Sequence, residues 1–433
     1  MKLILIELNE INFDVVKEYI NSGESLPSFN KIINNNLIET VAEIDYENLE
    51  PWIQWVSVHT GKKYSDHNIF RLGDIINSDI KQIFEQVEDL GYKVGAISPM
   101  NAKNNLRNPS FFIPDPWTKT DSDKSYLSKS ITRSISQAVN DNTQSKLTFR
   151  TVVDIIYATL ALINPLKIIT LAFYALSSIG KPWRKALFLD KLIHEFHKTL
   201  YRRKKPDFST IFLNAGAHIQ HHYFFNSPFI KDRSLSNPSW YIDDDQDPML
   251  EMLISYDKII KDYLEMKGVE IIIATGLSQK PYNKLKIYYR LNDHALFLNQ
   301  VGINFQDITP RMTRDFLVTF ADPSDALKAQ EDLSSIMVNH KEKLFGYIDN
   351  RGIDLFVTLT YPYEITDKTT ITFNDYKFLL KEHVSFVAIK NGMHDAKGYA
   401  FLSDGLDNPF PDKKTHVSNI HGVILNFFKN TYG

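Results

Sequence analysis

The 433-residue sequence contains no cysteine, and its formal net charge at neutral pH is only −3. The absence of cysteine excludes disulfides, thiol nucleophiles and thiolate metal ligands, and it is typical of a chain in a reducing compartment. So small a net charge leaves no general basic excess to neutralise phosphates, so we expect no nucleic-acid partner.

Long hydrophobic runs are also lacking. A membrane-spanning helix needs about 20 consecutive apolar residues, and no segment of the sequence reaches that length without interruption. The apolar run at the N-terminus is too short for a signal peptide, and no small-residue cleavage site follows it. We therefore predict that the protein is cytoplasmic, either free or at the inner face of the membrane.

The order of apolar segments predicts the fold class. Residues 3–8 form a strand-length apolar run, and residues 80–90 form an amphipathic helix that Gly91 closes before a strand at 93–98. Helix, glycine and strand in this order are typical of a doubly wound, mostly parallel α/β sheet. We expect 1–114 and 206–433 to form two parts of one α/β domain, with a polar loop plus an apolar helical insertion at 115–205 and a small α/β side module near 287–375.

The insertion has the most unusual composition. Residues 152–180 are strongly apolar, are broken at Asn164-Pro165 and carry only Asp154 and Lys167 as charged residues. Basic residues surround this segment, namely Arg150, Lys181, Arg184, Lys185 and residues 202–205. One interpretation is a helical hairpin buried against the main domain. The other is a monotopic insertion that contacts anionic lipid through 152–180, as a peripheral membrane protein would.

Two N-terminal motifs carry a family resemblance. Residues 3–12 are an apolar strand that ends in a polar tip, and residues 50–61 (EPWIQWVSVHTG) precede the turn 66–70 (DHNIF). Together they resemble the opening of the alkaline phosphatase superfamily, in its phosphodiesterase, nucleotide pyrophosphatase and phosphomutase branch. In that family the strand ends in Asp-Gly and the helix begins at a Thr or Ser nucleophile. Here Asn9 stands at the Asp position, and Glu50 or Pro51 stands at the nucleophile position.

The resemblance implies an alkaline phosphatase-like fold and a pocket at the carboxyl ends of the strands, where two divalent cations clamp a phosphoryl group. Residues 217–221 match the spacing of the family's Asp-x-x-x-His, with Ala217 at the Asp position and His221 retained. Residues 214–218 are an alternative alignment of the same motif. Thr275-Gly276 replace the expected Asp-His, while the turn 392–398 keeps His394. We expect either one zinc or manganese ion held by His221, His394 and Asn9, or no metal cofactor.

Other polar residues complete the predicted pocket. Pro51 at the first helical position aims the N-terminus of the helix at the pocket, so we expect Glu50 to be a nucleophile, a general base or an internal anion at the phosphate position, with a surface glutamate as the alternative. His218 and His221, clustered after the strand 208–213, suit metal ligation or proton transfer, with structural histidines as the alternative. The predicted catalytic residues are Glu50, His218 and His221, and the predicted substrate-binding residues are Asn9, Glu10, Asn12, Gln54 and His222.

Three functions fit this pattern. The first is a phosphohydrolase, phosphodiesterase or phosphoryl-group transferase, which the resemblance implies; the apolar insertion adds the expectation of a phosphorylated small-molecule or lipid-linked glycan substrate. The second is a metal-independent glycosyl transferase that uses Glu50 in the same pocket. The third is a catalytically degenerate binding or scaffold protein.

Overall fold

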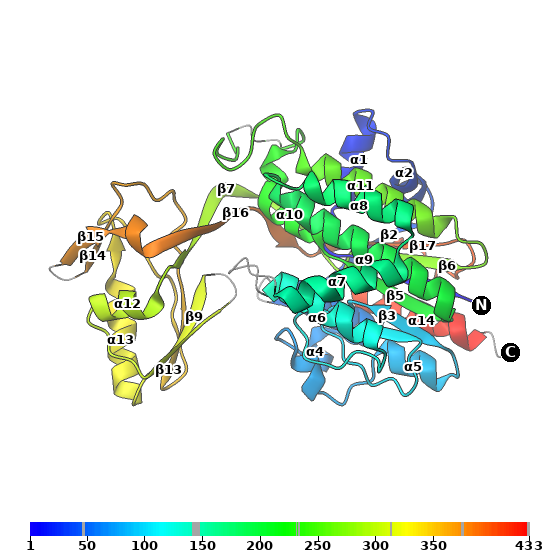
Figure 1. The fold of residues 1–433 in the computed structure, drawn as a ribbon, viewed down its shortest axis with the longest axis horizontal. Helices are drawn as coiled ribbons and strands as arrows, with labels where there is room; N and C mark the ends of the chain where they lie inside the picture. The colour runs from blue at the N-terminus through cyan, green and yellow to red at the C-terminus, as the bar shows by residue number, and fades with distance from the viewer. Residues whose placement is uncertain are drawn as a thin grey trace. The chain divides into compact units, whose positions relative to one another are not determined.

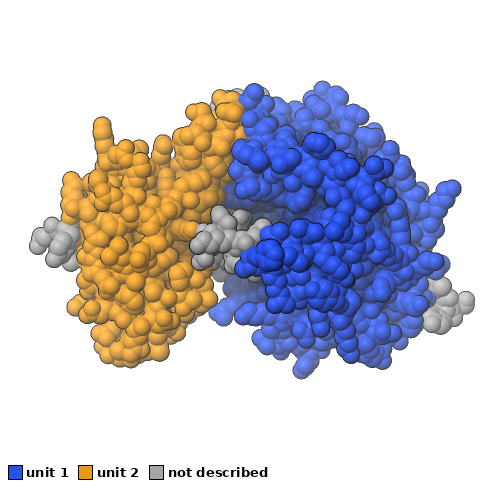
Figure 2. Space-filling model, viewed as in Figure 1, with its two compact units in different colours: residues 1–231, 245–281, 392–433 blue, residues 232–244, 282–391 orange. Residues whose placement is uncertain are grey.

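The computed structural model describes residues 1–45, 48–140, 148–230, 232, 234–311, 314–373 and 376–430. The chain forms two compact units, coloured separately in Figure 2. Unit 1 contains residues 1–231, 245–281 and 392–433, and unit 2 contains residues 232–244 and 282–391. The chain leaves unit 1 within β7 (Ser278–Leu291) and returns within β16 (Val384–Asp395), and these two strands pair.

Unit 1 is built on an eight-stranded sheet with the order β18-β2-β17-β6-β1-β5-β3-β4. Its strands are β1 (Leu3–Leu8), β2 (Leu37–Val41), β3 (Val94–Ile97), β4 (Phe111–Ile113), β5 (Phe208–Leu213), β6 (Glu270–Ala274), β17 (Lys397–Leu402) and β18 (Lys414–His416). Only β17 runs antiparallel to its neighbours β2 and β6. The predicted mostly parallel α/β sheet is confirmed.

Helices cover both faces of this sheet (Figure 1). The helices α3 (Pro51–Thr60), α5 (Ile83–Asp89) and α14 (Ile420–Lys429) pack with one face in a shared apolar core. The other side carries α9 (Pro182–Lys204), α10 (Ala215–Tyr223) and α11 (Pro248–Leu264). Every residue of β1 and β5 is therefore buried, which is why these strands are nearly continuous apolar runs in the sequence.

The remaining helices of unit 1 are α1 (Phe13–Asn21), α2 (Pro27–Asn34), α4 (Tyr64–His67), α6 (Tyr126–Asn140), α7 (Phe149–Leu162) and α8 (Pro165–Leu176). The expectation of a polar loop in the first part of 115–205 did not foresee α6, which forms because Ile131 and Ile135 recur at helical spacing and are buried. Between α7 and α8, Asn164 accepts a hydrogen bond from the Leu166 amide and Pro165 opens the new helix. Within the described part of the chain, no helix combines the length and apolarity needed to cross a membrane.

Unit 2 has its own apolar core and two four-stranded antiparallel sheets. One sheet contains β10 (Met337–Val338), β11 (Glu342–Lys343), β14 (Thr370–Phe373) and β15 (Tyr376–Leu379). The other contains β8 (Asp307–Pro310), β9 (Asp315–Thr319), β12 (Asp349–Asn350) and β13 (Asp354–Thr358). Its helices are α12 (His294–Gln300) and α13 (Pro323–Ser335). The range 287–375 predicted for a side module falls inside this unit.

Candidate metal centre

Glu10 is the buried carboxylate at the centre of the candidate site. It follows β1 directly, has a φ of 63° and is only 2% exposed. A positive φ is unusual for a residue with a side chain, so the surrounding contacts must hold this conformation. Asn9 Nδ2 donates to Glu10 Oε1 at 3.1 Å, and Gln279 Nε2 donates to Glu10 Oε2 at 2.5 Å.

Two histidines from distant parts of unit 1 converge on the same oxygen of Glu10. His221 lies on α10, and His394 lies near the end of β16. The Nε2 atom of His221 is 3.2 Å from Glu10 Oε2, and that of His394 is 3.3 Å away. Burial would raise the pKa of Glu10, but His394 and His221 together lower it well below its usual value. Glu10 is therefore a carboxylate facing two imidazole nitrogens.

This donor set fits a divalent metal ion. One ligand atom from each of Glu10, His221 and His394 lies within 4.8 Å of the others. Two imidazoles and one carboxylate suit zinc, manganese or iron. The Nδ1 atom of His221 is 3.1 Å from the Gly392 carbonyl oxygen, and a proton on Nδ1 leaves Nε2 with the lone pair that a metal needs.

Glu50 lies next to this cluster. It is the N-cap residue of α3, with Pro51 at the first helical position, but its side chain makes no capping hydrogen bond. Glu50 Oε2 is 3.6 Å from His394 Nδ1, and the Glu50 side chain is 33% exposed. The imidazole of His394 therefore stands between a buried carboxylate, Glu10, and an accessible one, Glu50.

Asn9, predicted as a metal ligand and substrate contact, orients its neighbours. Its Oδ1 atom accepts the indole N–H of Trp55 at 2.8 Å, and its Nδ2 atom donates to Asn214 Oδ1 at 2.8 Å as well as to Glu10. These contacts connect α3, β1 and the start of α10. A direct contact between Asn9 and a metal stays a prediction.

The other two predicted histidines lie on the same helix as His221. His218 and His222 are one turn apart on α10, both partly buried, with ring centroids 4.7 Å apart. The ring of His222 is 6.3 Å from that of His221. The group whose ligand atoms converge contains neither His218 nor His222, so their catalytic and binding roles stay predictions.

The N-terminus of α10 is held by a buried pair from the helices behind it. Asp190 of α9 accepts the Ala215 amide at 2.8 Å, the Asn214 amide at 3.3 Å and the Tyr256 hydroxyl at 2.6 Å. The same hydroxyl accepts the Gly216 amide at 2.8 Å. Burial raises the pKa of Asp190 to about 6 despite these donors. The position of His221 thus depends on a polar anchor that supplies the missing cap of its helix.

Asn12 and Gln54, predicted to bind substrate, make structural hydrogen bonds. Asn12 caps α1 by accepting the Asp14 amide at 2.9 Å, and it donates to the Gln279 carbonyl at 2.8 Å. Gln54 is fully buried, and its Nε2 atom donates to the Asn48 carbonyl at 2.9 Å. These bonds brace the loops that present Glu10 and Glu50, and a substrate contact for either residue stays a prediction.

Gln279 is the site residue that sequence reasoning missed. It lies five residues after β6, fully buried, and it donates to both Glu10 Oε2 and the Ala217 carbonyl. The Asp-His pair of the family pattern aligns with Thr275-Gly276, immediately after the strand. The available signal was a polar amide just beyond a strand of the central sheet, where loops converge.

A second group in the described residues, His194, Glu195 and Asp262, also brings potential ligand atoms within 4.8 Å of one another. Lys198 forms ion pairs with both of these carboxylates, and Lys167 pairs with Glu195. Because lysine ammonium groups already neutralise the carboxylates, this group is an ion-pair network rather than a metal site.

Comparison with known proteins found similarity only among solved structures. No protein-family model and no curated protein matches the chain. Phosphonoacetate hydrolase from Sinorhizobium meliloti 1021 matches at 12% identity with a TM-score of 0.44, over 99% of this chain and 96% of that chain. Murine ectonucleotide pyrophosphatase/phosphodiesterase 5 matches at 10% identity with a TM-score of 0.41, over 99% and 95%. The alkaline phosphatase of the Antarctic bacterium TAB5 matches at 10% identity with a TM-score of 0.41, over 99% and 97%. All three are members of the alkaline phosphatase superfamily, which the sequence motifs resemble.

Proposed function

We propose that this chain is a metal-dependent enzyme that hydrolyses or transfers a phosphoryl group, with Glu10, His221 and His394 holding one divalent cation. The observation that carries the proposal is the approach of two imidazole Nε2 atoms to one buried oxygen of Glu10. Without a cation this arrangement would need a proton on each facing nitrogen to avoid repulsion between lone pairs. With a cation, all three groups serve as ligands in their ordinary protonation states.

The chemistry divides between the ion and the side chains around it. A divalent cation at this site would polarise a phosphoryl oxygen and stabilise the charge that develops during displacement. Glu50 is the accessible carboxylate beside it, and it acts as the general base that takes a proton from the attacking water or hydroxyl. Glu50 Oε2 lies 3.6 Å from His394 Nδ1, so the imidazole is close enough to orient this carboxylate electrostatically. Gln279 and Asn9 fix the Glu10 carboxylate from the other side.

We further propose that the substrate is a phosphate ester attached to an apolar carrier, such as a lipid-linked glycan. The apolar, solvent-exposed helices α7 and α8 belong to the same unit as the metal centre, which supports a carrier with a lipid portion. The assignment of the metal ligands depends neither on the identity of the carrier nor on whether the phosphoryl group is hydrolysed or transferred.

Elemental mass spectrometry of protein purified without chelator or affinity metal tests the proposal. We expect near-stoichiometric zinc or manganese in the wild type and its loss in a His221→Ala, His394→Ala double variant. The matched control is His340→Ala, which changes an exposed histidine of unit 2 and should retain the metal. Turnover of p-nitrophenyl phosphate and bis(p-nitrophenyl) phosphate should follow metal content. A folded wild type that takes up none of zinc, manganese and iron on incubation would overturn the proposal.

A further inference from the structure

Exposed apolar side chains concentrate on one short part of unit 1. In the described part of the chain, 25 large hydrophobic side chains are exposed, and eleven of them lie within residues 149–179, on α7, α8 and the turn after α8. They are Phe149, Val152, Val153, Ile156, Tyr157, Leu160, Leu166, Ile169, Phe173, Leu176 and Ile179. Scattered exposed hydrophobic residues are ordinary, but a cluster of this size marks an interaction surface.

The helix α7 exposes large apolar residues, while its four buried residues, Thr151, Asp154, Ala158 and Leu162, are half polar. Its inward side includes Thr151 and Asp154, and Asp154 is buried in an ion pair with Arg133 of α6, with distances of 2.9 and 3.0 Å. Its outward side carries Phe149, Val153 and other apolar residues at helical spacing. A helix packed only against its own protein would place these groups the other way round. The outward face of α7 is therefore built to contact something apolar.

The helix α8 repeats the pattern. Leu171 is its only buried residue, whereas Leu166, Ile169, Phe173 and Leu176 are exposed at spacings of three and four residues, which form one stripe. Both helices pack on α9, which fixes them to the body of unit 1. We refer to the exposed apolar residues of 149–179 as the α7–α8 face.

The charges in the segment that carries the α7–α8 face are mostly positive. Residues 148–189 contain five basic residues and a single acidic residue, Asp154, which is buried. The basic residues are Arg150, Lys167, Lys181, Arg184 and Lys185. Lys167 and Arg184 form ion pairs with acidic residues outside the segment, while Arg150 and Lys185 are exposed. Around the apolar residues the segment thus presents cations and no exposed carboxylate.

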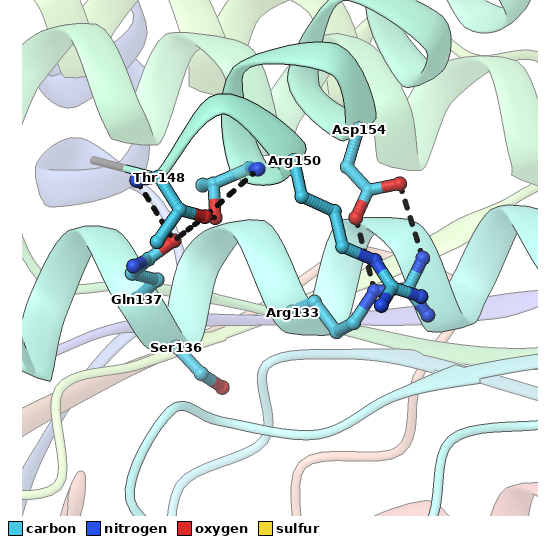
Figure 3. A pocket seen from close by; sticks show the side chains of 7 residues that line it. Arg133, Ser136, Gln137, Thr148, Arg150 and Asp154 are labelled. Carbon is cyan, nitrogen blue, oxygen red and sulfur yellow. Dashed lines mark hydrogen bonds and ion pairs between the residues drawn. The ribbon is translucent and has the colours of Figure 1, made fainter.

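A polar crevice opens at the N-terminal end of α7, between α7 and α6. It has a volume of about 440 Å³ and is lined by residues of α6 and α7, with Thr148 between them (Figure 3). Among the described residues that line it, Arg150 and Arg133 are cationic and Asp154 is the one acidic residue, so this described lining carries net positive charge. The hydroxyl of Ser136 adds a donor, whereas the Thr148 hydroxyl donates to Gln137 Oε1 at 3.0 Å. Guanidinium and hydroxyl donors beside an apolar stripe match the phosphate of a lipid headgroup next to its acyl chains.

We propose that the α7–α8 face binds the surface of an anionic lipid bilayer, with its apolar side chains at the headgroup–acyl boundary and its basic residues at the headgroups. An apolar stripe with cationic neighbours is the pattern of a helix that lies in the membrane interface. A second copy of this chain is a poorer partner, because two such faces would bring their cations together. The inference goes beyond the proposed catalytic function and does not depend on it.

Vesicle flotation of the full chain tests this inference. The probes are vesicles of phosphatidylcholine alone and vesicles with about 30% phosphatidylglycerol. We expect the wild type to float with the anionic vesicles. A Leu166→Ser, Phe173→Ser variant, which changes side chains that are 75% and 68% exposed, should lose about tenfold or more in partitioning. The matched control is Leu296→Ser, Leu327→Ser, two residues of unit 2 that are 59% and 54% exposed, and it should float like the wild type.

A charge variant completes the experiment. Arg150→Gln with Lys185→Gln should weaken binding to anionic vesicles and reduce its dependence on salt. Failure of the wild type to bind either vesicle, or equal binding by the Leu166→Ser, Phe173→Ser variant, overturns the inference. A concentration-dependent dimer that disappears in that variant, without vesicle binding, would assign the face to a second copy and also overturn it. Metal content and turnover of a soluble ester should stay unchanged in all of these variants, which separates this test from that of the metal centre.

Discussion

Replacing Gly392 by alanine tests the proposed metal centre through a single methyl group. Gly392 lies two residues before His394, and its carbonyl faces His221 Nδ1 at 3.1 Å. A Cβ atom at this position would lie 2.6 Å from the Gln220 carbonyl oxygen and 2.2 Å from Gln279 Oε1. The φ of Gly392 lies outside the left-handed region, so the effect of the substitution is steric and not conformational.

The size of the effect follows from these distances. To restore an ordinary contact, the Gly392 and Gln220 backbones must separate by about 0.8 Å. A shift of that size along the His221–Gly392 bond would stretch it to about 3.9 Å, which is beyond hydrogen-bonding range. The Gln279 side chain must also move and would release Glu10. Loss of such supporting contacts lowers metal affinity about 10- to 100-fold, or roughly 1.4 to 2.7 kcal/mol.

The assay is competition for zinc between the protein and a chromogenic chelator, with circular dichroism to check the fold. The matched control is Gly422→Ala, because Gly422 lies in α14 of the same unit and an added Cβ there meets nothing within 4 Å. The control should bind zinc like the wild type. If Gly392→Ala binds zinc as tightly as the control while both remain folded, the support of His221 by Gly392 does not matter, and the reasoning is refuted.

Three further predictions follow from the same structure. Glu50→Gln should lower kcat by about 100-fold or more with metal content unchanged. If elemental analysis shows that the variant loses metal in the same proportion as it loses activity, the role of Glu50 as a base is contradicted. Burial, with the nearby His194, lowers the pKa of His197 to about 3. Because the unfolded chain takes up that proton near pH 6.5, the free energy of unfolding should fall as pH drops below 6.5, by about 2 kcal/mol at pH 5 from His197 alone. Urea titrations at pH 7.5 and 5 check this, and His197→Gln should show a smaller fall. Removing bound metal with a chelator should lower Tm by roughly 2 °C or more, since a ligand at 100 times its Kd stabilises the native state by about 2.7 kcal/mol; an unchanged Tm after proven metal removal would contradict the assignment.

The sheet was predictable because the burial of each strand determines the residue types within that strand. The strands β1 and β5 are buried on both faces, so their sequences are apolar runs of strand length, and glycine and polar residues mark where they end. The helix α6 was missed because its many serine and threonine residues resemble a loop. Only the buried pair Ile131 and Ile135, one turn apart, indicated a helix.

The candidate site was predictable in part. His221 and His394 stood out because they match family motifs, and the structure brings them together. The motif aligned Asn9 with the family's Asp, so Asn9 was predicted as a metal ligand and Glu10 only as a substrate-binding residue. The structure adds the Glu10 carboxylate to the two histidines, while a contact between Asn9 and a metal stays a prediction. The sequence did not reveal the left-handed backbone of Glu10 or the hydrogen bond from the Trp55 indole to the Asn9 oxygen. Both depend on tertiary packing that a pattern of residue types does not contain.

The insertion of unit 2 between residues 281 and 392 has a consequence for how the protein matures. Glu10 and His221 precede residues 282–391 of unit 2 along the chain, whereas His394 follows them, and β17, which joins β6 to β2, comes later still. A growing chain therefore holds an incomplete sheet and two of the three proposed ligands until unit 2 has been synthesised. Metal uptake at this centre would report that synthesis has passed residue 394, and a chain truncated before that residue would carry His221 and Glu10 without their third partner.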